Sequence, residues 1–299
     1  MARHPETTES AIRSIIAYMK STGHYSQETI RTYYWHMRTT MRLINTNFDE
    51  NATPRTVTRE QIVGLLDLLR QSGYMPTTQR IYLFALRTLC EYCGNRVFDS
   101  MRIAYQTDMR PNADWLSLHD AETVLDTQMD ARERIIIWLG LCHGLRRVEI
   151  VRMRTGDIDG DCITVRGKGQ GSAKLRVIRT HPQFKAVLKE WLAERKSLVS
   201  GAENHTDALI IYRKGKYVHE YTASGIAQIV IAVSRRADIP FSSHTLRRTF
   251  GREMYHCGVA IPTIQAIYGH KSIDQTIRYL GINLDDMASA MSRFNLGQR

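Results

Sequence analysis

Five short segments of the chain carry side chains that could act on a phosphate ester. In chain order they are Gly144-Leu145-Arg146-Arg147-Val148-Glu149, Gly167-Lys168-Gly169, His244-Thr245-Leu246-Arg247, Gly269-His270 and Tyr279. A guanidinium is always charged and binds phosphate oxygens in pairs, so it can neutralise the charge that builds when a nucleophile attacks phosphorus. A tyrosine hydroxyl, with a pKa of about 10, needs a neighbour to take its proton, and histidine can do so near neutral pH. Each segment alone is weak evidence, because a chain with 11 histidines and 14 tyrosines contains such residues by chance.

The order and the local sequence of these segments resemble the catalytic signature of the tyrosine recombinase family, which includes phage integrases, Xer recombinases and Cre. The residues from His244 to Phe250 are similar to the family's H-x-L-R-H-T-F box. Those from Ile264 to Ser272 are similar to its I-Q-x-L-L-G-H-x-S box, and those from Thr276 to Tyr279 to its T-x-x-Y end. The resemblance covers nearly the whole chain, and its specificity comes mainly from residues 144–149 and 244–279.

The resemblance implies an enzyme that cuts a strand of double-stranded DNA with Tyr279, leaving a 3′-phosphotyrosyl link and a free 5′ hydroxyl. This link retains the energy of the phosphodiester, so a partner strand can be joined without ATP. The resemblance also implies that the enzyme needs no metal and no cofactor. Arg146 and Arg247 would clamp the scissile phosphate, and His270 would contact it. In the family such reactions take place in a tetrameric synapse on DNA, which makes further copies of the chain the expected partners.

The proton-transfer groups follow from the same resemblance. His244 is the expected base, a lysine of the hairpin is the expected general acid, and Glu149 orients the cationic groups. Arg147 is a rival to Arg146 because Arg147-Val148 replaces the family's commoner Ile-Ser, but the register with Glu149 favours Arg146. The hairpin is longer than the usual G-K-G-x-K-x-R, so Lys168 and Lys174 both remain candidates, and we favour Lys168.

The first hundred residues have the pattern of a small all-helical domain. Apolar residues predict helices over 12–19, from Ser26 onward, over 58–71 and from Pro76 to Gly94. Basic residues on these helices, away from the apolar faces, are candidate DNA contacts: Arg31, Arg38, Arg42, Arg80 and Arg87. We interpret residues 1–104 as a helical core-binding domain and residues 105–115 as a linker.

The rest of the chain, residues 116–299, is predicted to be an α+β catalytic domain. Ser117 resembles a helix cap, an apolar helix follows over 135–142, and 162–166 with 175–178 read as a strand pair around a glycine-rich turn. A short strand is expected over 208–212, and the predicted helices span 183–196, 222–236, 245–257, 261–268 and 284–293. The expected fold class is therefore mainly α with a small β-sheet.

The predicted C-terminal helix has one apolar face, made by Leu284, Met287, Met291 and Phe294. A short helix of this kind is not stable alone and has to dock on other protein. Family members often pass this helix to the adjacent protomer, and we hypothesise the same here, with packing on its own domain as the alternative.

Composition agrees with a DNA partner. Lys and Arg number 41 against 30 Asp and Glu, which gives a net charge of +11 and favours a polyanion. No apolar run approaches a membrane span and the N-terminus lacks a signal-peptide core, so we expect no membrane and a cytoplasmic location. No metal site is expected either. Cys90 and Cys93 have no second pair, and Asp157 to Asp161 starts like a calcium loop but continues with Cys162 where glycine is required.

Two other functions compete with a recombinase. A non-catalytic DNA-binding protein would not need the complete set of candidate catalytic side chains. A type IB topoisomerase-like enzyme would share the chemistry, but the helical N-terminal half and the Gly269-His270 box favour the recombinase.

Overall fold

The computed structural model describes residues 7–103, 114–167 and 175–282, together with residues 286, 288, 291 and 292. The described chain divides into two compact units, the first ending before residue 104 and the second starting at residue 114. Each unit has a hydrophobic core of its own. No described helix is long and apolar enough to cross a membrane.

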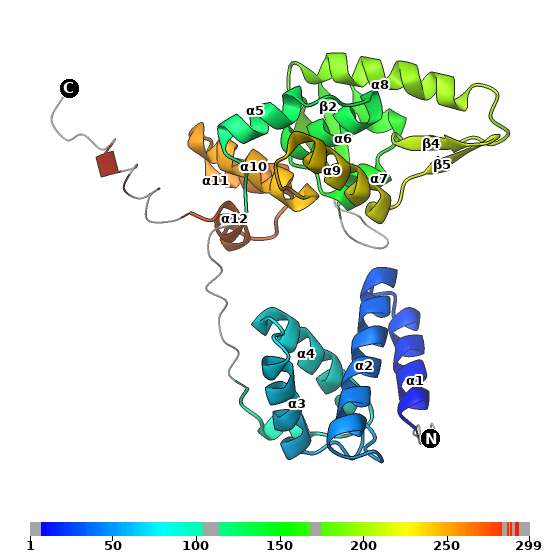
Figure 1. Ribbon diagram of the computed structural model, residues 1–299, viewed down its shortest axis with the longest axis vertical. Helices are drawn as coiled ribbons and strands as arrows, with labels where there is room; N and C mark the ends of the chain where they lie inside the picture. Colours follow the sequence, from blue (N-terminus) through cyan, green and yellow to red (C-terminus); the bar gives the residue numbers. More distant parts are fainter. Residues whose placement is uncertain are drawn as a thin grey trace. The chain divides into compact units, whose positions relative to one another are not determined.

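The first unit is built from helices, drawn in blue to cyan in Figure 1. They are α1 (Thr8–Ser21), α2 (Gln27–Asn47), α3 (Arg59–Gln71) and α4 (Pro76–Tyr92), followed by a short 3-10 helix at Val97–Ser100. Ser26 caps α2 by accepting a hydrogen bond from the Thr29 amide, and Thr58 caps α3 in a capping box. The four helices predicted from apolar spacing are confirmed.

The core of the first unit lies where these helices face one another. Ile12 and Ile15 of α1 meet Met37 and Met41 of α2 there, and all four side chains are buried. The five candidate DNA-contacting arginines are exposed, as expected for residues off the apolar faces.

The second unit is also mainly helical (Figure 1). Its helices are α5 (Leu118–Asp126), α6 (Ala131–Leu141), α7 (Arg147–Arg152), α8 (Phe184–Val199), α9 (Ala223–Ala237), α10 (Ser243–His256), α11 (Ile261–Tyr268) and α12 (Ile273–Leu280). A 3-10 helix lies at Thr155–Asp157. The sequence did not predict α7 or α12, which have only six and eight residues. The predicted helix over 284–293 falls largely outside the described residues.

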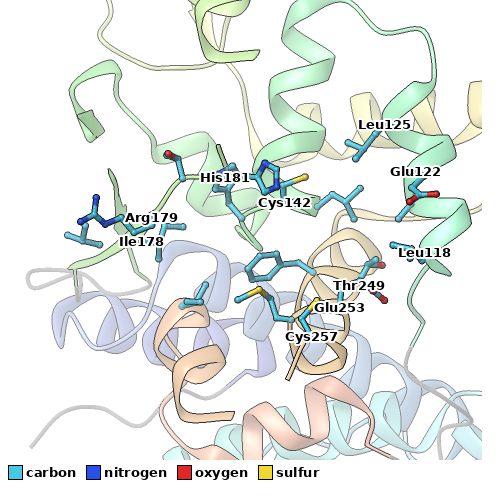
Figure 2. A pocket seen from close by; sticks show the side chains of 18 residues that line it. Leu118, Glu122, Leu125, Cys142, Ile178, Arg179, His181, Thr249, Glu253 and Cys257 are labelled. Atoms are coloured by element: carbon cyan, nitrogen blue, oxygen red, sulfur yellow. The ribbon is translucent and has the colours of Figure 1, made fainter. Parts of the chain in front are cut away.

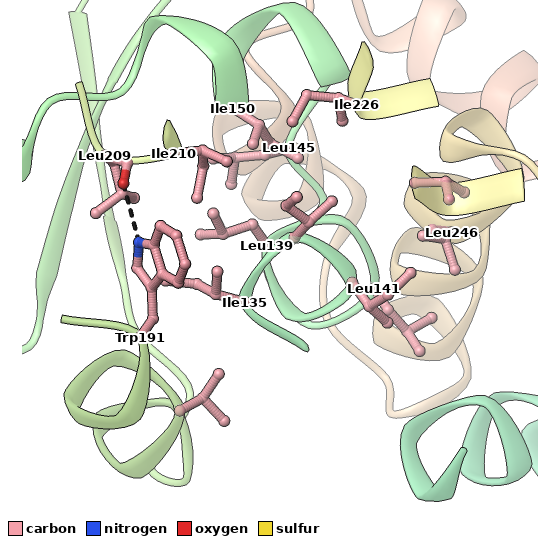
Figure 3. Close-up of a cluster of buried hydrophobic side chains, with 14 of the residues drawn as sticks. Ile135, Leu139, Leu141, Leu145, Ile150, Trp191, Leu209, Ile210, Ile226 and Leu246 are labelled. Atoms are coloured by element: carbon pink, nitrogen blue, oxygen red, sulfur yellow. Dashed lines mark hydrogen bonds between the residues drawn. The ribbon is translucent and has the colours of Figure 1, made fainter. Parts of the chain in front are cut away.

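Helix α6 forms the centre of the second unit's core. Ile135, Ile136 and Leu139 are fully buried, so the second half of the helix is enclosed on several sides by apolar side chains. Figure 3 shows Ile135 and Leu139 between Trp191 of α8 and Leu246 of α10. The Trp191 indole donates a hydrogen bond of 2.9 Å to the Leu209 carbonyl, which satisfies its one polar atom inside the core.

Two small antiparallel sheets complete this unit. The first joins β1 (Ile158–Asp159), β2 (Cys162–Arg166) and β3 (Leu175–Arg179), with Ile163 opposite Ile178 and Val165 opposite Arg176. The predicted strand pair is therefore confirmed. The second sheet joins β4 (Ile211–Lys214) to β5 (Tyr217–Glu220).

The strand expected over 208–212 begins later than predicted, at Ile211. Ala208 forms only an isolated bridge with Arg154, and Leu209 and Ile210 are buried. These residues therefore fill the core instead of starting the hairpin. With this correction the fold is mainly α with small antiparallel sheets, as expected.

Candidate active site

Five of the predicted site residues lie in one connected network in the second unit. They are Arg146, Glu149, Arg247, His270 and Tyr279. Helices α7, α10 and α12 carry Glu149, Arg247 and Tyr279, Arg146 is the N-cap of α7, and His270 lies between α11 and α12. Lys168 and Lys174, the two candidates for the general acid, lie outside the described residues.

Arg146 sits at the N-cap of α7 and is tied to Glu149 one turn later. Its backbone amide donates to Glu149 Oε2 at 2.8 Å, and its Nη1 donates to Glu149 Oε1 at 3.0 Å. Nη1 also donates to the Tyr268 carbonyl at 3.1 Å. The neighbouring Arg147 is exposed. The structure thus brings Arg146, and not its rival, to the buried carboxylate.

Glu149 is 3% exposed and also binds a residue that sequence reasoning had not assigned to the site. Arg176 of β3 donates from Nη1 to Oε1 and from Nη2 to Oε2, both at 2.9 Å. Burial raises the pKa of Glu149, but the hydrogen bonds and charge of Arg176 and the charge of Arg247 outweigh it and leave the pKa below its usual value. Glu149 is therefore ionised at neutral pH.

Arg247 is 1% exposed, which is unusual for an arginine. Its Nη1 donates to the Gly144 carbonyl and its Nη2 donates to the Tyr268 carbonyl at 2.9 Å. Nη1 lies 3.5 Å from Glu149 Oε2. Burial, followed by the charge of Arg146, lowers the pKa of Arg247 to about 10, so the side chain stays charged at neutral pH.

Tyr268 packs its ring against the Arg247 guanidinium, a role that the sequence analysis did not assign to it. The Arg247 guanidinium lies 4.1 Å from the centre of the Tyr268 ring, and the Tyr268 hydroxyl donates to the Arg247 carbonyl. Gly251 makes room for that hydroxyl, because a Cβ at residue 251 would collide with it. The sequence signal was present only as a tyrosine directly before Gly269-His270.

His270 is buried and makes a hydrogen bond through each ring nitrogen. Arg247 Nη2 lies 3.3 Å from Nε2, and since a guanidinium only donates, Nε2 accepts. The proton is then on Nδ1, which donates to Thr276 Oγ1 at 3.0 Å. Burial, followed by the charges of Arg247 and Arg146, lowers the pKa of His270 to about 4. His270 is therefore neutral over the physiological range.

His244 lies in the first turn of α10 and is exposed. Partial desolvation lowers its pKa, and the charges of Arg147 and Arg248 lower it further. A neutral, accessible imidazole beside several arginines can accept a proton at neutral pH.

Tyr279 is half-buried on α12 with its ring at the centre of the network. Its ring lies 5.4 Å from that of His270 and 5.3 Å from that of Tyr268, edge to face in both cases. Burial raises the pKa of Tyr279, although the charges of Arg247, Arg248 and Arg146 oppose this. Its hydroxyl is buried and makes no hydrogen bond of ordinary geometry within the described chain. Such a group is costly unless it acquires a partner.

The five candidate DNA-contacting arginines lie on the first unit, on α2 and α4. Arg38 is 3.7 Å from Glu9 and donates to the Tyr34 hydroxyl, and Arg87 is paired with Glu91 at 2.6 Å. These exposed ion pairs are weak and can be exchanged for phosphate.

Comparison with known sequences places this site in a family. The model of the Phage integrase family matches residues 114–284, which is more than half of the chain and contains every described residue of the network. The chain belongs to the phage integrase family. This confirms the tyrosine recombinase resemblance.

Similar curated proteins share the same class name. The tyrosine recombinase XerD of Listeria monocytogenes is 25% identical over 242 residues, covering 77% of this chain and 80% of XerD. XerD of Oceanobacillus iheyensis is 22% identical over 281 residues, covering 91% of this chain and 93% of that protein. XerC of Staphylococcus aureus is 29% identical over 164 residues, covering 53% and 51%.

Solved integrases and recombinases share the fold. The XerH site-specific recombinase in its pre-cleavage complex with difH substrate has a TM-score of 0.66 and 19% identity, covering 95% of this chain and 84% of that one. A lambda integrase dimer bound to a COC′ core site has a TM-score of 0.68 and 16% identity, covering 92% and 95%. At these identities the likeness concerns the fold alone.

Proposed function

We propose that this integrase-family chain is a site-specific DNA recombinase whose nucleophile is Tyr279. The observation that carries the proposal is the buried Tyr279 hydroxyl, which makes no hydrogen bond of ordinary geometry in the described chain and lies beside Arg247, among the charges of Arg146, Arg247 and Arg248. A phosphate at this position would pair with the guanidinium groups and place phosphorus beside the hydroxyl. The Nε atoms of Arg247 and Arg248 are also buried without a hydrogen-bond partner in the described chain, so they could bind the same anion.

The cationic residues stabilise the transition state in this mechanism. When Tyr279 Oη attacks, negative charge grows on the nonbridging oxygens of a five-coordinate phosphorus. Arg146 and Arg247 are already fixed by bonds to Glu149, to Gly144 and to the Tyr268 carbonyl, so little reorganisation is needed. His270 lies against the Tyr279 ring and beside Arg247, and it would donate to the same phosphate from Nε2 once the anion accepts from Arg247 and the imidazole proton is on Nε2.

Two proton transfers balance the reaction. The bond from Tyr279 Oη to phosphorus forms while the bond from phosphorus to the 5′ oxygen breaks. His244 accepts the tyrosine proton, and a hairpin lysine, Lys168 in preference to Lys174, protonates the departing 5′ oxygen. Attack by a 5′ hydroxyl of a partner strand reverses these steps and rejoins the DNA, so the reaction consumes no ATP. Arg146 and Arg247 neutralise the charge on the phosphate, so we expect no requirement for a metal.

The first unit supplies DNA affinity in this proposal. We assign residues 1–104 to a DNA-binding domain, 105–115 to a linker and 116–299 to the catalytic domain. The exposed arginines Arg31, Arg38, Arg42, Arg80 and Arg87 would contact phosphates, so binding should weaken steeply as salt is raised. The curated relatives are bacterial, and bacterial DNA lies in the cytoplasm, which is where we place the activity.

Assembly on DNA would use the C-terminal segment and a cavity in the second unit. The cavity has a volume of about 660 Å³ and is lined mainly by apolar side chains of α5, α10 and β3 (Figure 2). Glu122, Glu253 and Arg179 also line it, and the segment beyond Tyr279 carries four apolar residues at helical spacing. We propose that the segment of a second copy occupies this cavity.

The nucleophile is tested with DNA selected by the protein itself. Duplexes are enriched from a random pool by binding to Tyr279→Phe, and a nick is then introduced so that the cleaved fragment diffuses away. Wild type should form an adduct that survives denaturation, and Tyr279→Phe should form none. Persistence of the adduct in Tyr279→Phe would overturn the proposal, and binding without any wild-type adduct would favour a non-catalytic DNA-binding protein.

Two additions separate the remaining alternatives. EDTA should leave adduct formation unchanged, and a strict requirement for added metal would contradict the mechanism. Relaxation of supercoiled plasmid without sequence preference would indicate a topoisomerase-like activity. For the assembly proposal, truncation after residue 283 should abolish multi-protomer complexes on paired sites while single-site binding persists. Intact assembly combined with a lower melting temperature would instead show that the segment packs on its own domain.

A further inference from the structure

Arg176 joins the network through Glu149, and each nitrogen of its guanidinium donates to a protein group. It lies on β3, with a side chain only 12% exposed. Its two Nη atoms form a parallel pair of bonds to the two carboxylate oxygens of Glu149, and its Nε donates to the Ile267 carbonyl at 2.7 Å. Such a fork fixes both the distance and the plane of the two groups.

The charges show why this fork matters. One carboxylate, Glu149, faces the three guanidinium groups of Arg146, Arg176 and Arg247. If Arg176 were absent, Glu149 would be free to turn toward Arg146 and Arg247 and to compete with DNA phosphate for their donors. With Arg176 in place, both carboxylate oxygens are held, and the backbone and side chain of Arg146 are aligned against them.

Arg176 also connects parts of the site that are distant in sequence. It lies two residues after Lys174 in the sequence, and its side chain reaches the last turn of α11 just before His270. Gly269 allows this approach, since a Cβ there would lie 3.3 Å from Arg176 Nη1, and its φ of +65° suits glycine. The β2–β3 hairpin, α7 and the His270 turn are thus joined through one guanidinium.

We propose that Arg176 is a positioning residue for DNA cleavage: it holds Glu149 so that Glu149 orients Arg146 and Arg247 toward the scissile phosphate. The inference rests on the proposed function of this site. Arg176 itself would touch neither DNA nor Tyr279. Its loss should therefore slow the chemical step and leave DNA binding nearly unchanged.

The test measures the adduct-forming rate constant at saturating protein together with the dissociation constant for the same nicked duplex. Arg176→Met should lower the rate constant roughly tenfold or more, since it breaks charge-assisted hydrogen bonds that align the site, and should change the dissociation constant less than about twofold. Arg176→Lys should fall between Met and wild type, because it keeps the charge but not the fork. Arg154→Met is the control, because Arg154 pairs with Glu220 and Asp207 outside the network and its loss should leave the rate unchanged.

A pH profile distinguishes this role from general support of the fold. Because Arg176 contributes most to keeping the Glu149 pKa low, that pKa should rise in Arg176→Met. Glu149 would then take up a proton at mildly acidic pH, so the ratio of wild-type to variant rate should grow as pH falls from about 8 to 5. A destabilised but well-aligned site would give a ratio independent of pH.

Three results would overturn the inference: a wild-type rate in Arg176→Met, an equal loss in Arg154→Met, or a loss that appears only in the dissociation constant. If thermal unfolding shows that Arg176→Met is not folded, Arg176→Lys is used in its place. A wild-type rate and an unchanged pH profile in Arg176→Lys would then refute the inference. Failure of the proposed function has a different result, because an adduct would then be absent in wild type or present in Tyr279→Phe.

Discussion

Replacing Glu149 with glutamine should destabilise the second unit strongly. The carboxylate accepts bonds of 2.8–3.0 Å from Arg146 and Arg176 and lies 3.5 Å from Arg247. Glutamine has no negative charge, and its NH₂ group would face the N–H donors of the arginines, with which it cannot form a hydrogen bond. Removing one partner of a buried ion pair costs about 3–5 kcal/mol, because the remaining charge is left uncompensated. Since whole domains are stable by about 5–15 kcal/mol, the variant should still fold.

Urea unfolding followed by tryptophan fluorescence measures this cost, because three of the four tryptophans, including the buried Trp191, lie in the second unit. The matched control is Asp157→Asn. Asp157 is also a buried carboxylate in a fork with an arginine, but the Arg166 side chain is 42% exposed, so water can replace the lost bonds and the cost should be about 1 kcal/mol. A loss in Glu149→Gln no larger than that in Asp157→Asn would refute the idea that Glu149 neutralises a buried cluster.

The pH dependence provides a second check on Glu149. Its folded pKa is lowered, so its stabilising contribution is complete above the unfolded pKa, about 4.5, and is lost as pH falls through the lower folded value. The difference in free energy of unfolding between wild type and Glu149→Gln should therefore shrink in strong acid. A constant difference would mean that the carboxylate charge is not the cause.

Three further predictions concern the supports of the site. Gly144→Ala should lower the free energy of unfolding by about 2 kcal/mol or more, since φ is +64° and a Cβ would lie 2.5 Å from a phenylalanine ring. Gly156→Ala is the control and should be nearly neutral, because a Cβ there would meet no atom within 4 Å. Equal melting temperatures of the two variants would contradict this prediction. The free energy of unfolding should fall as pH is lowered from about 6.5 to 4, because the unfolded chain takes up the proton that His270 resists, and His270→Asn should reduce this slope by up to about 1.4 kcal/mol per pH unit in urea titrations. Arg252→Met should lower the melting temperature and slow adduct formation, because its fork to Asp286, with bonds of 2.6 and 2.8 Å, holds the chain just beyond α12; an unchanged adduct rate would show that this fork does not position the nucleophile.

The sequence predicted most helices because their apolar residues recur at helical spacing and their caps are local. Ser26 and Ser117 both act as N-caps where the sequence placed them. It missed α7, because a six-residue helix has too few turns to show a period. It also missed α12, although α11 has the same length of eight residues and was predicted. Motif spacing brought out Arg146, Arg247, His270 and Tyr279 as a set, but nothing local indicated that Tyr268 lies beneath the Arg247 guanidinium.

Arg176 escaped prediction for a different reason. In β3 the apolar Leu175 and Val177 are 63% and 64% exposed, while Arg176 and Ile178 face inward. The alternation of the strand therefore runs against the ordinary hydrophobic pattern. Only the register with β2, which sets Arg176 opposite the buried Val165, decides which face turns inward. The arginine that ends the family's G-K-G-x-K-x-R motif was a signal for Arg176, but it did not indicate which side chain Arg176 binds.

The spacing of nine residues between His270 and Tyr279 follows from helix geometry. Ser272 caps α12, and Thr276 and Tyr279 are three residues apart, so both face the same side; Thr276 holds His270 while Tyr279 packs against its ring. Inserting one alanine after Ile277 should rotate Tyr279 by about 100° away from the site and abolish the adduct with little loss of DNA binding. An insertion of one alanine into the exposed β4–β5 turn, at Gly215, is the control. If the α12 insertion formed the adduct at the wild-type rate, the helix would not be what positions the nucleophile.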